Sequence, residues 1–156
     1  MKLSKIIVIA LICCSFKSPA AAQSVNVKSY LDKEMLSQFV VDNFDILTIR
    51  SSFGSRRISG QPNYFKSFGL TPTTINKQEI IFDEKDWFYG VKILGVKDYN
   101  DDGIEDIAVC FTDRAKEGSY YTVTPLILTR YSESMPLIAL AHAPYYAECL
   151  RKGGDN

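Results

Sequence analysis

The chain has 156 residues, a formal net charge of zero and a single histidine, His142. This length fits one domain with its own hydrophobic core. The chain lacks the dense basic patch that is typical of nucleic-acid binding, and one histidine excludes a metal site that needs two or three imidazoles. Composition therefore favours a single globular domain without a nucleic-acid partner.

The first 22 residues have the pattern of a secretory signal peptide. Basic residues precede an apolar run at residues 6–16, which is too short to span a bilayer, and small alanines suit cleavage after Ala22. A lipoprotein anchored at Cys14 is the alternative interpretation. No later apolar run approaches the length of a membrane span, so we expect a periplasmic or secreted protein that leaves the membrane after cleavage.

Cleavage would leave one exported domain over residues 23–150 and a polar tail, residues 151–156, that we expect to be disordered. It would remove three lysines and no acid, so acidic side chains would exceed basic ones by three. Two of the four cysteines would also leave. Cys110 and Cys149 would remain in an oxidising compartment, where we expect a disulfide between them; a buried free thiol at Cys110 is the alternative.

The predicted elements are taken in chain order. Residues 27–41 have apolar side chains spaced as on one face of an amphipathic helix. Residues 44–50 indicate a short strand, and residues 51–62 a loop rich in serine and glycine. Further strands separated by polar turns are predicted at residues 64–68, 80–82, 87–96, 107–112, 120–131 and 136–141. We therefore predict an α+β fold, with the N-terminal helix packed on a twisted antiparallel meander of about five to seven strands.

Residues 98–106 form the most distinctive motif. Oxygen-bearing side chains occupy its first, third, fifth and ninth positions, and Gly103 occupies the sixth. These nine residues resemble the calcium loops of integrin-α-type and VCBS-type β repeats. The resemblance implies a structural calcium ion whose ligands are the side chains of Asp98, Asn100, Asp102 and Asp106 and the backbone carbonyl of Ile104.

This acidic loop has two other interpretations, an EF-hand and a solvated hairpin turn. An EF-hand requires a glutamate at the twelfth position, where Val109 stands, and helices on both sides, where strands are predicted. A solvated hairpin turn remains the alternative, because Asn, Asp and Gly are the usual turn-forming residues. Against it stands the repulsion among five acidic side chains within nine residues, which a cation would relieve.

The sequence carries no recognisable catalytic machinery. No G-x-S-x-G turn presents a serine to His142, and residues 23–156 contain no S-x-x-K motif of the serine β-lactamases. Asp83, Glu84 and Asp86 are candidates for the carboxylate pair of a glycosidase, although they fit a solvated turn better. We therefore expect a protein that is not an enzyme.

A candidate binding segment joins two predicted strands just after the acidic loop. It contains Arg114, whose guanidinium can hold a carboxylate through two hydrogen bonds, and Tyr120 and Tyr121, which can supply an amphipathic wall. Arg56 and Arg57 form a second basic spot in the loop at residues 51–62. Ordinary surface charge is the alternative interpretation of both segments.

A second resemblance lies in residues 98–106, 110–120 and 128–131. These stretches are similar to small exported proteins that protect carbapenem-producing bacteria from their own antibiotic. The resemblance implies non-enzymatic protection against a β-lactam, a carboxylate-bearing small molecule, by binding or sequestration, and it assigns no residue a role. The alternatives are a periplasmic inhibitor or immunity protein that blocks a toxic enzyme, and a calcium-stabilised structural or interaction module.

Overall fold

The computed structural model describes residues 26–53, 63–140 and 147–150. The expected signal peptide (residues 1–22) and tail (residues 151–156) lie outside the described residues, as do Arg56, Arg57 and His142. None of the helices in the described part of the chain is long and apolar enough to cross a membrane.

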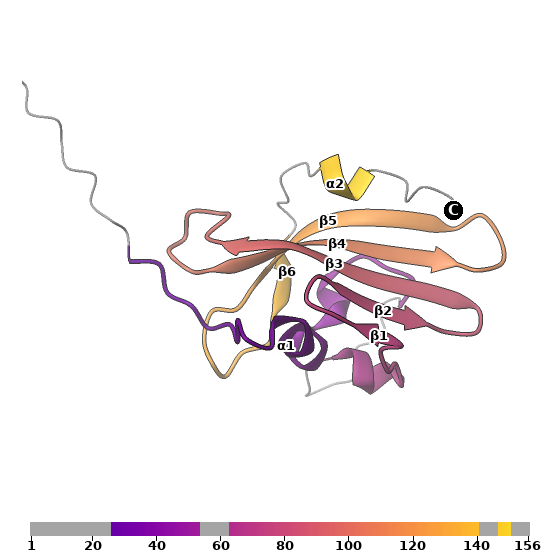
Figure 1. The fold of residues 1–156 in the computed structure, drawn as a ribbon, viewed down its shortest axis with the longest axis horizontal. Coiled ribbons are helices and arrows are strands. Elements are labelled where there is room, and N and C mark those ends of the chain that lie inside the picture. The colour runs from indigo at the N-terminus through magenta and orange to yellow at the C-terminus, as the bar shows by residue number, and fades with distance from the viewer. Residues whose placement is uncertain (1–25, 54–62, 141–146, 151–156) are drawn as a thin grey trace, which may run out of the picture.

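One antiparallel sheet of six strands forms the centre of the described chain (Figure 1). Every strand pairs with its neighbours in sequence, so the sheet is a meander, as predicted. Its strands are β1 Thr74–Ile75, β2 Glu79–Asp83, β3 Trp87–Lys97, β4 Asp106–Ala115, β5 Tyr121–Thr129 and β6 Ile138–Leu140. The helices are α1 Leu36–Asn43 and α2 Ala147–Leu150, with 3-10 helices η1 Ile46–Thr48 and η2 Phe65–Phe68. This mostly β architecture is compatible with the predicted α+β class only in a loose sense.

The two faces of the sheet differ because successive side chains of a strand point to opposite sides. On the side of α1, η1 and η2, which we call the core face, apolar side chains pack into one buried cluster. Val91 on β3 lies opposite Phe111 on β4, and both are buried there with Val40 of α1. Figure 1 shows α2 on the other side of the sheet, which we call the outer face. Alternate residues of a strand therefore point to the core face and to the outer face, although parts of β4 and β5 are buried on both faces.

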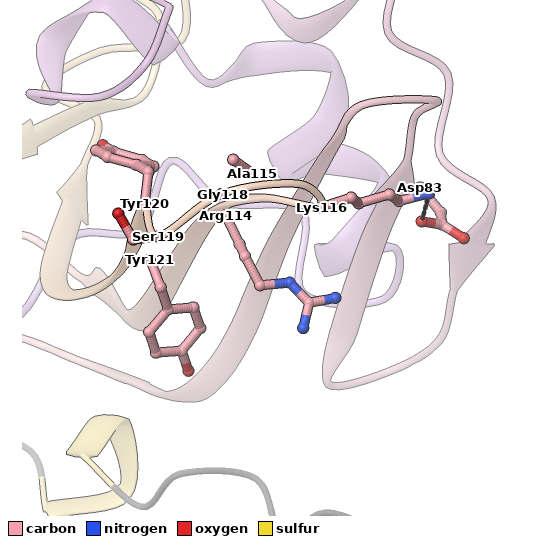
Figure 2. Close-up of a pocket in the computed structure, with 8 residues that line it drawn as sticks. All are labelled: Asp83, Arg114, Ala115, Lys116, Gly118, Ser119, Tyr120 and Tyr121. Carbon is pink, nitrogen blue, oxygen red and sulfur yellow. Dashed lines mark ion pairs between the residues drawn. The ribbon is translucent and has the colours of Figure 1, made fainter.

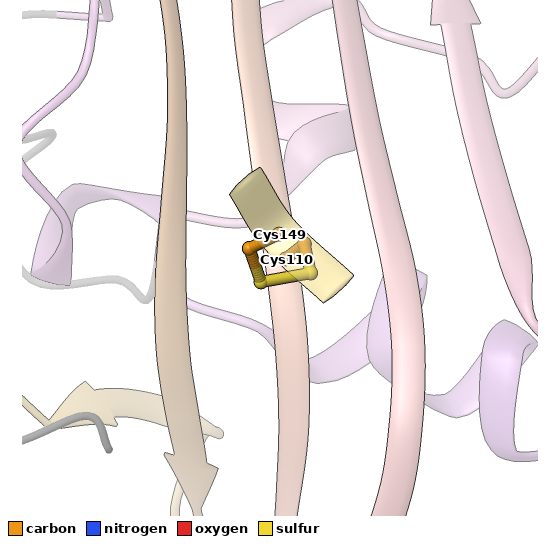
Figure 3. The surroundings of a disulfide bond; sticks show 2 residues. All are labelled: Cys110 and Cys149. Atoms are coloured by element: carbon orange, nitrogen blue, oxygen red, sulfur yellow. A yellow bond between two sulfur atoms is a disulfide. The ribbon is translucent and has the colours of Figure 1, made fainter. Parts of the chain in front are cut away.

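The disulfide between Cys110 and Cys149 is confirmed. Cys110 lies on the outer face of β4 and Cys149 in α2, with a Cα–Cα distance of 5.3 Å (Figure 3). Both side chains are buried, at 3% and 4% exposure. The bond joins α2 to the sheet across 39 residues, and it is compatible with an oxidising compartment outside the cytoplasm.

The predicted helix over residues 27–41 is not confirmed, because α1 begins only at Leu36. Before it, the backbone of Lys28 exchanges hydrogen bonds with the acidic loop, donating to Gly103 (2.9 Å) and accepting from Glu105 (2.8 Å). Asp32 accepts the amide protons of two following residues, a turn that competes with helix formation. The apolar spacing of residues 27–35 therefore does not correspond to a helix.

Two predicted strands are wrong. Phe44 makes an isolated parallel bridge to Leu137, but the chain then turns into η1, where the side chain of Asp45 accepts a hydrogen bond from the amide of Leu47. Residues 64–68 form η2, which ends at Gly69 with a φ of 75°. In both segments the aromatic and β-branched residues that favour strands are buried by tertiary packing instead. The short strand β1 was not predicted.

Candidate functional site

A row of three side chains crosses the outer face at the end of β4. Arg114 lies directly opposite Phe88 on β3 and Tyr121 on β5. The guanidinium carbon of Arg114 stands 5.0 Å from the centre of the Phe88 ring, within the range of a cation–π contact. Gly90 follows Phe88 on the same face, and a Cβ there would come within 3.3 Å of the Phe88 ring. The missing side chain thus gives this ring room to lie along the sheet.

All three predicted ligand-binding residues, Arg114, Tyr120 and Tyr121, line one cavity, but they reach it from different sides of the strands. Figure 2 shows Arg114 and Tyr121 extending to the same side of the strands, whereas Tyr120 extends the other way. Neighbouring residues in an extended chain point to opposite faces, so only Tyr121 shares the outer face with Arg114, although Tyr120 lines the same cavity. The hydroxyl of Tyr120 instead donates a hydrogen bond to Asp113 (3.2 Å) on the core side.

Arg114 differs from its cationic neighbour in having no partner carboxylate. Lys116 pairs with Asp83 at 2.7 Å, the dashed contact in Figure 2. Within residues 26–53, 63–140 and 147–150, no acidic side chain pairs with Arg114. Two cavities of about 510 Å³ and 360 Å³ adjoin on the outer face, and Arg114 and Tyr121 line both. Among the described residues, the site therefore presents a guanidinium without an ion pair between two aromatic side chains, and the acids Glu79, Asp83 and Glu148 also line these cavities.

The candidate glycosidase carboxylates do not line one common cavity. Asp83 lines the outer-face cavity beside Arg114, whereas Glu84 lines a cavity on the core side. Asp86 lines neither of them. A carboxylate pair for glycoside hydrolysis must flank one scissile bond, and this arrangement offers no such pair among the three.

The acidic loop folds as a tight turn whose carboxylates face its own backbone amides. Asp98 accepts hydrogen bonds from the amides of Asp102 (3.2 Å) and Gly103 (2.8 Å). The side chain of Asp102 accepts from the amide of Ile104 (2.9 Å). Asp101 and Gly103 both have positive φ, 59° and 82°. The side-chain oxygens of Asp98 and Asp102 thus accept hydrogen bonds from amides of the loop itself.

Asp106 closes this loop from inside the fold. Its side chain is 0% exposed, and one oxygen accepts a hydrogen bond from the amide of Tyr99 (3.0 Å). The other oxygen, Oδ1, has no hydrogen-bond partner. Burial raises the pKa of the Asp106 carboxyl, and the nearby carboxylates of Asp102 and Asp98 raise it further. The nearby hydroxyl of Thr129 lowers this pKa, although the two side chains do not form a hydrogen bond of normal geometry. A buried carboxylate oxygen without a hydrogen-bond partner can serve as a ligand to a cation.

The predicted calcium ligands do not form a complete coordination shell in the structure. No group of three or more acidic, histidine or cysteine side chains lies close enough to hold a metal ion in the part of the chain that the structure describes. Residues 26–35, which precede α1 and which we call the N-terminal arm, also contact the loop, because Lys33 forms a 2.6 Å ion pair with Glu105. That ion pair lowers the pKa of the Glu105 carboxyl. Glu105 is not one of the predicted calcium ligands.

A buried polar network on the core face was not predicted. Asp113 is 0% exposed and accepts hydrogen bonds from the amide and hydroxyl of Ser52 (2.7 and 2.9 Å), besides that from Tyr120. The Ser52 hydroxyl also contacts that of Tyr89 (3.3 Å). The sequence offered a signal, because the alternation of Ile107, Val109 and Phe111 with smaller or polar residues, continued by two positions, places Asp113 on the same face.

Comparison with protein families, curated proteins and solved structures finds no match to this chain.

Proposed function

We propose that the protein is an exported, non-enzymatic binding protein that holds a carboxylate-bearing small molecule at Arg114. The observation that carries this proposal is the guanidinium of Arg114, which has aromatic neighbours on both sides but no carboxylate partner among the described residues. A planar guanidinium binds a carboxylate through two parallel hydrogen bonds, and its stacking on Phe88 limits how it can turn. The site would thus be ordered for such a ligand before binding.

The ligand we propose is a β-lactam of the carbapenem class. These molecules carry a carboxylate, and the second half of the chain resembles small exported carbapenem self-resistance proteins. The cavities at Arg114 exceed about 300 Å³, the lower end of the range for small-molecule sites. Protection would follow from sequestration in the periplasm, because holding the drug there lowers the concentration that reaches its targets.

We also propose that the acidic loop holds a structural calcium ion. Asp98, Asn100, Asp102, Asp106 and the carbonyl of Ile104 would be its ligands, and the ion would supply positive charge to a loop of crowded carboxylates. The orphaned oxygen of Asp106 supports this assignment. Because Lys28 and Lys33 attach the N-terminal arm to the same loop, calcium would also hold this arm to the end of the sheet.

Antibiotic susceptibility tests the proposed function directly. The chain is expressed with its own leader in a carbapenem-sensitive bacterium, beside variants Arg114→Ala and Lys97→Ala. Lys97 is a matched cation, which lies opposite Asp106 at the other end of β4. We expect the wild-type chain and Lys97→Ala to raise the inhibitory concentration, and Arg114→Ala to lose most of that protection.

Immunoblotting of the periplasmic fraction verifies that all three forms reach the compartment. Unchanged susceptibility with the wild-type protein present there contradicts a protective role against carbapenems. Protection that survives Arg114→Ala places the binding site elsewhere. Inhibition of a wall hydrolase by the purified protein, without carbapenem binding, would favour the inhibitor or immunity alternative.

A further inference from the structure

A second cavity, of about 490 Å³, opens on the core side of the sheet. Trp87 and Tyr89 of β3 line it, so it lies on the face opposite Phe88 and the Arg114 site. Four aromatic side chains and one carboxylate are among its lining residues, which are Ser52, Phe53, Phe68, Leu70, Glu84, Trp87 and Tyr89.

The aromatic rings of this cavity form a connected wall. The Phe53 ring stacks on that of Tyr89 with centroids 4.5 Å apart, and Phe68 lies 5.5 Å from Phe53. Trp87 is nearly parallel to Tyr89, with an interplanar angle of 5° and centroids 6.2 Å apart. Tyr89 is anchored in the core and through its hydroxyl contact with Ser52. The four aromatic residues therefore form one connected part of the cavity lining.

The charged side chains that the structure describes at this cavity are acidic. Glu84 lines it, and the buried Asp113 lies behind it, in contact with Ser52. Burial raises the pKa of the Tyr89 hydroxyl, and Asp113 and Glu84 raise it further, so both carboxylates act on the same wall residue. In the described ranges of the chain, no lysine or arginine pairs with Glu84 or Asp113.

We propose that this cavity binds an organic cation, such as a quaternary ammonium group. Aromatic faces attract cations through their quadrupoles, and walls of several rings are the usual recognition element for quaternary ammonium ligands. Glu84, which pairs with no lysine or arginine among the described residues, adds a negative charge that attracts a cation, does not favour a neutral aromatic ligand and repels an anion. The proposal is independent of the Arg114 site, because the two lie on opposite faces of the sheet.

Tryptophan fluorescence gives a direct readout, since Trp87 is the single tryptophan of the chain. The purified protein is titrated with choline chloride and, separately, with 3,3-dimethylbutan-1-ol, the neutral analogue of the same shape. Sodium chloride at equal concentration controls for ionic strength. We expect a saturable fluorescence change with choline, no saturation with salt, and binding of the neutral alcohol at least about tenfold weaker.

Glu84→Gln should weaken choline binding about tenfold, because it removes the charge and keeps the shape. Asp86→Asn is the matched control, an exposed acid two positions away that does not line the cavity, and it should bind as the wild type does. Phe53→Leu removes one ring and should also weaken binding. Circular dichroism verifies that each variant is folded. The proposal is overturned by the absence of saturation with choline, by equal binding of alcohol and choline, or by a Glu84→Gln variant that binds as tightly as the wild type.

Discussion

Asp113 accepts a hydrogen bond from Tyr120 at 3.2 Å on the core side of the β4–β5 hairpin, while the next residue along, Arg114, extends to the outer face. Two consecutive residues of β4 therefore serve different sites: Asp113 anchors Ser52 behind the aromatic cavity, and Arg114 stacks on Phe88. The rigid strand pairing of β3, β4 and β5 fixes both.

Replacing Asp113 by alanine should destabilise the fold. The carboxylate accepts three hydrogen bonds, and its removal would leave the part-buried amide of Ser52 without an acceptor and the Ser52 hydroxyl with only its contact to Tyr89. We expect a loss of about 2–4 kcal/mol in the free energy of unfolding, measured by urea denaturation. Asp86→Ala, an exposed acid, should change it by less than about 0.5 kcal/mol. Equal effects of the two substitutions would show that the network contributes nothing.

The disulfide should contribute substantially to stability. Joining two residues that are 39 positions apart restricts the unfolded chain, which corresponds to about 4 kcal/mol by loop-closure entropy. The double variant Cys110→Ala, Cys149→Ala should therefore unfold at markedly lower urea concentration. The wild-type protein treated with a reductant should approach the same midpoint. A midpoint unchanged by both treatments would contradict this account of the bond.

Calcium should raise the melting temperature of the protein, because ligand binding to the folded state alone stabilises it. Asp98→Asn and Asp106→Asn should abolish most of this rise, measured by differential scanning calorimetry. Asp101→Asn is the matched control within the loop: it is not a predicted ligand, and asparagine tolerates its positive φ of 59°. A melting temperature insensitive to millimolar calcium in the wild type would rule out the site.

Tyr89 should make stability depend on pH in the alkaline range. Burial raises the pKa of its hydroxyl above the ordinary value of 10.0, so the folded state holds this proton more tightly than the unfolded state. The contribution of this pKa shift to the free energy of unfolding is fully present below pH 10.0, and it is lost as the pH rises through the pKa of Tyr89 in the folded state. The stability difference between wild type and Tyr89→Phe should therefore shift against the wild type above pH 10.0. A difference that stays constant up to pH 11 would contradict the shift.

The meander was predictable where local pattern and tertiary environment agree. Residues 87–96 and 107–112 alternate or carry β-branched and aromatic side chains, and they lie in β3 and β4. Residues 44–50 and 64–68 have similar composition but are held by packing, as in the stacking of Phe65 on Phe82 at 4.3 Å. Composition alone does not distinguish a strand from a short buried turn.

In the candidate sites, too, local sequence pattern predicts some features, whereas others depend on tertiary structure. Arg114 was predictable as a cation near a turn, but its stacking on Phe88 depends on strand register, which short-range pattern does not fix. Both tyrosines line the cavity at Arg114, but their opposite directions depend on where β5 begins, because Tyr120 lies one position before it and points away from Tyr121. Asp113 was assigned to a loop, although β4 continues to Ala115 and carries this acid into the core.

Isothermal titration calorimetry with a carbapenem tests the central claim most directly. The drug is titrated into the wild-type protein and into Arg114→Ala, Arg114→Lys and Lys97→Ala, with mass spectrometry of the drug afterwards. We predict saturable binding to the wild type and to Lys97→Ala, intact drug, and binding about tenfold or more weaker in both Arg114 variants, since lysine lacks the planar fork. Absence of binding to the wild type, or equal binding to Arg114→Ala, would contradict the account.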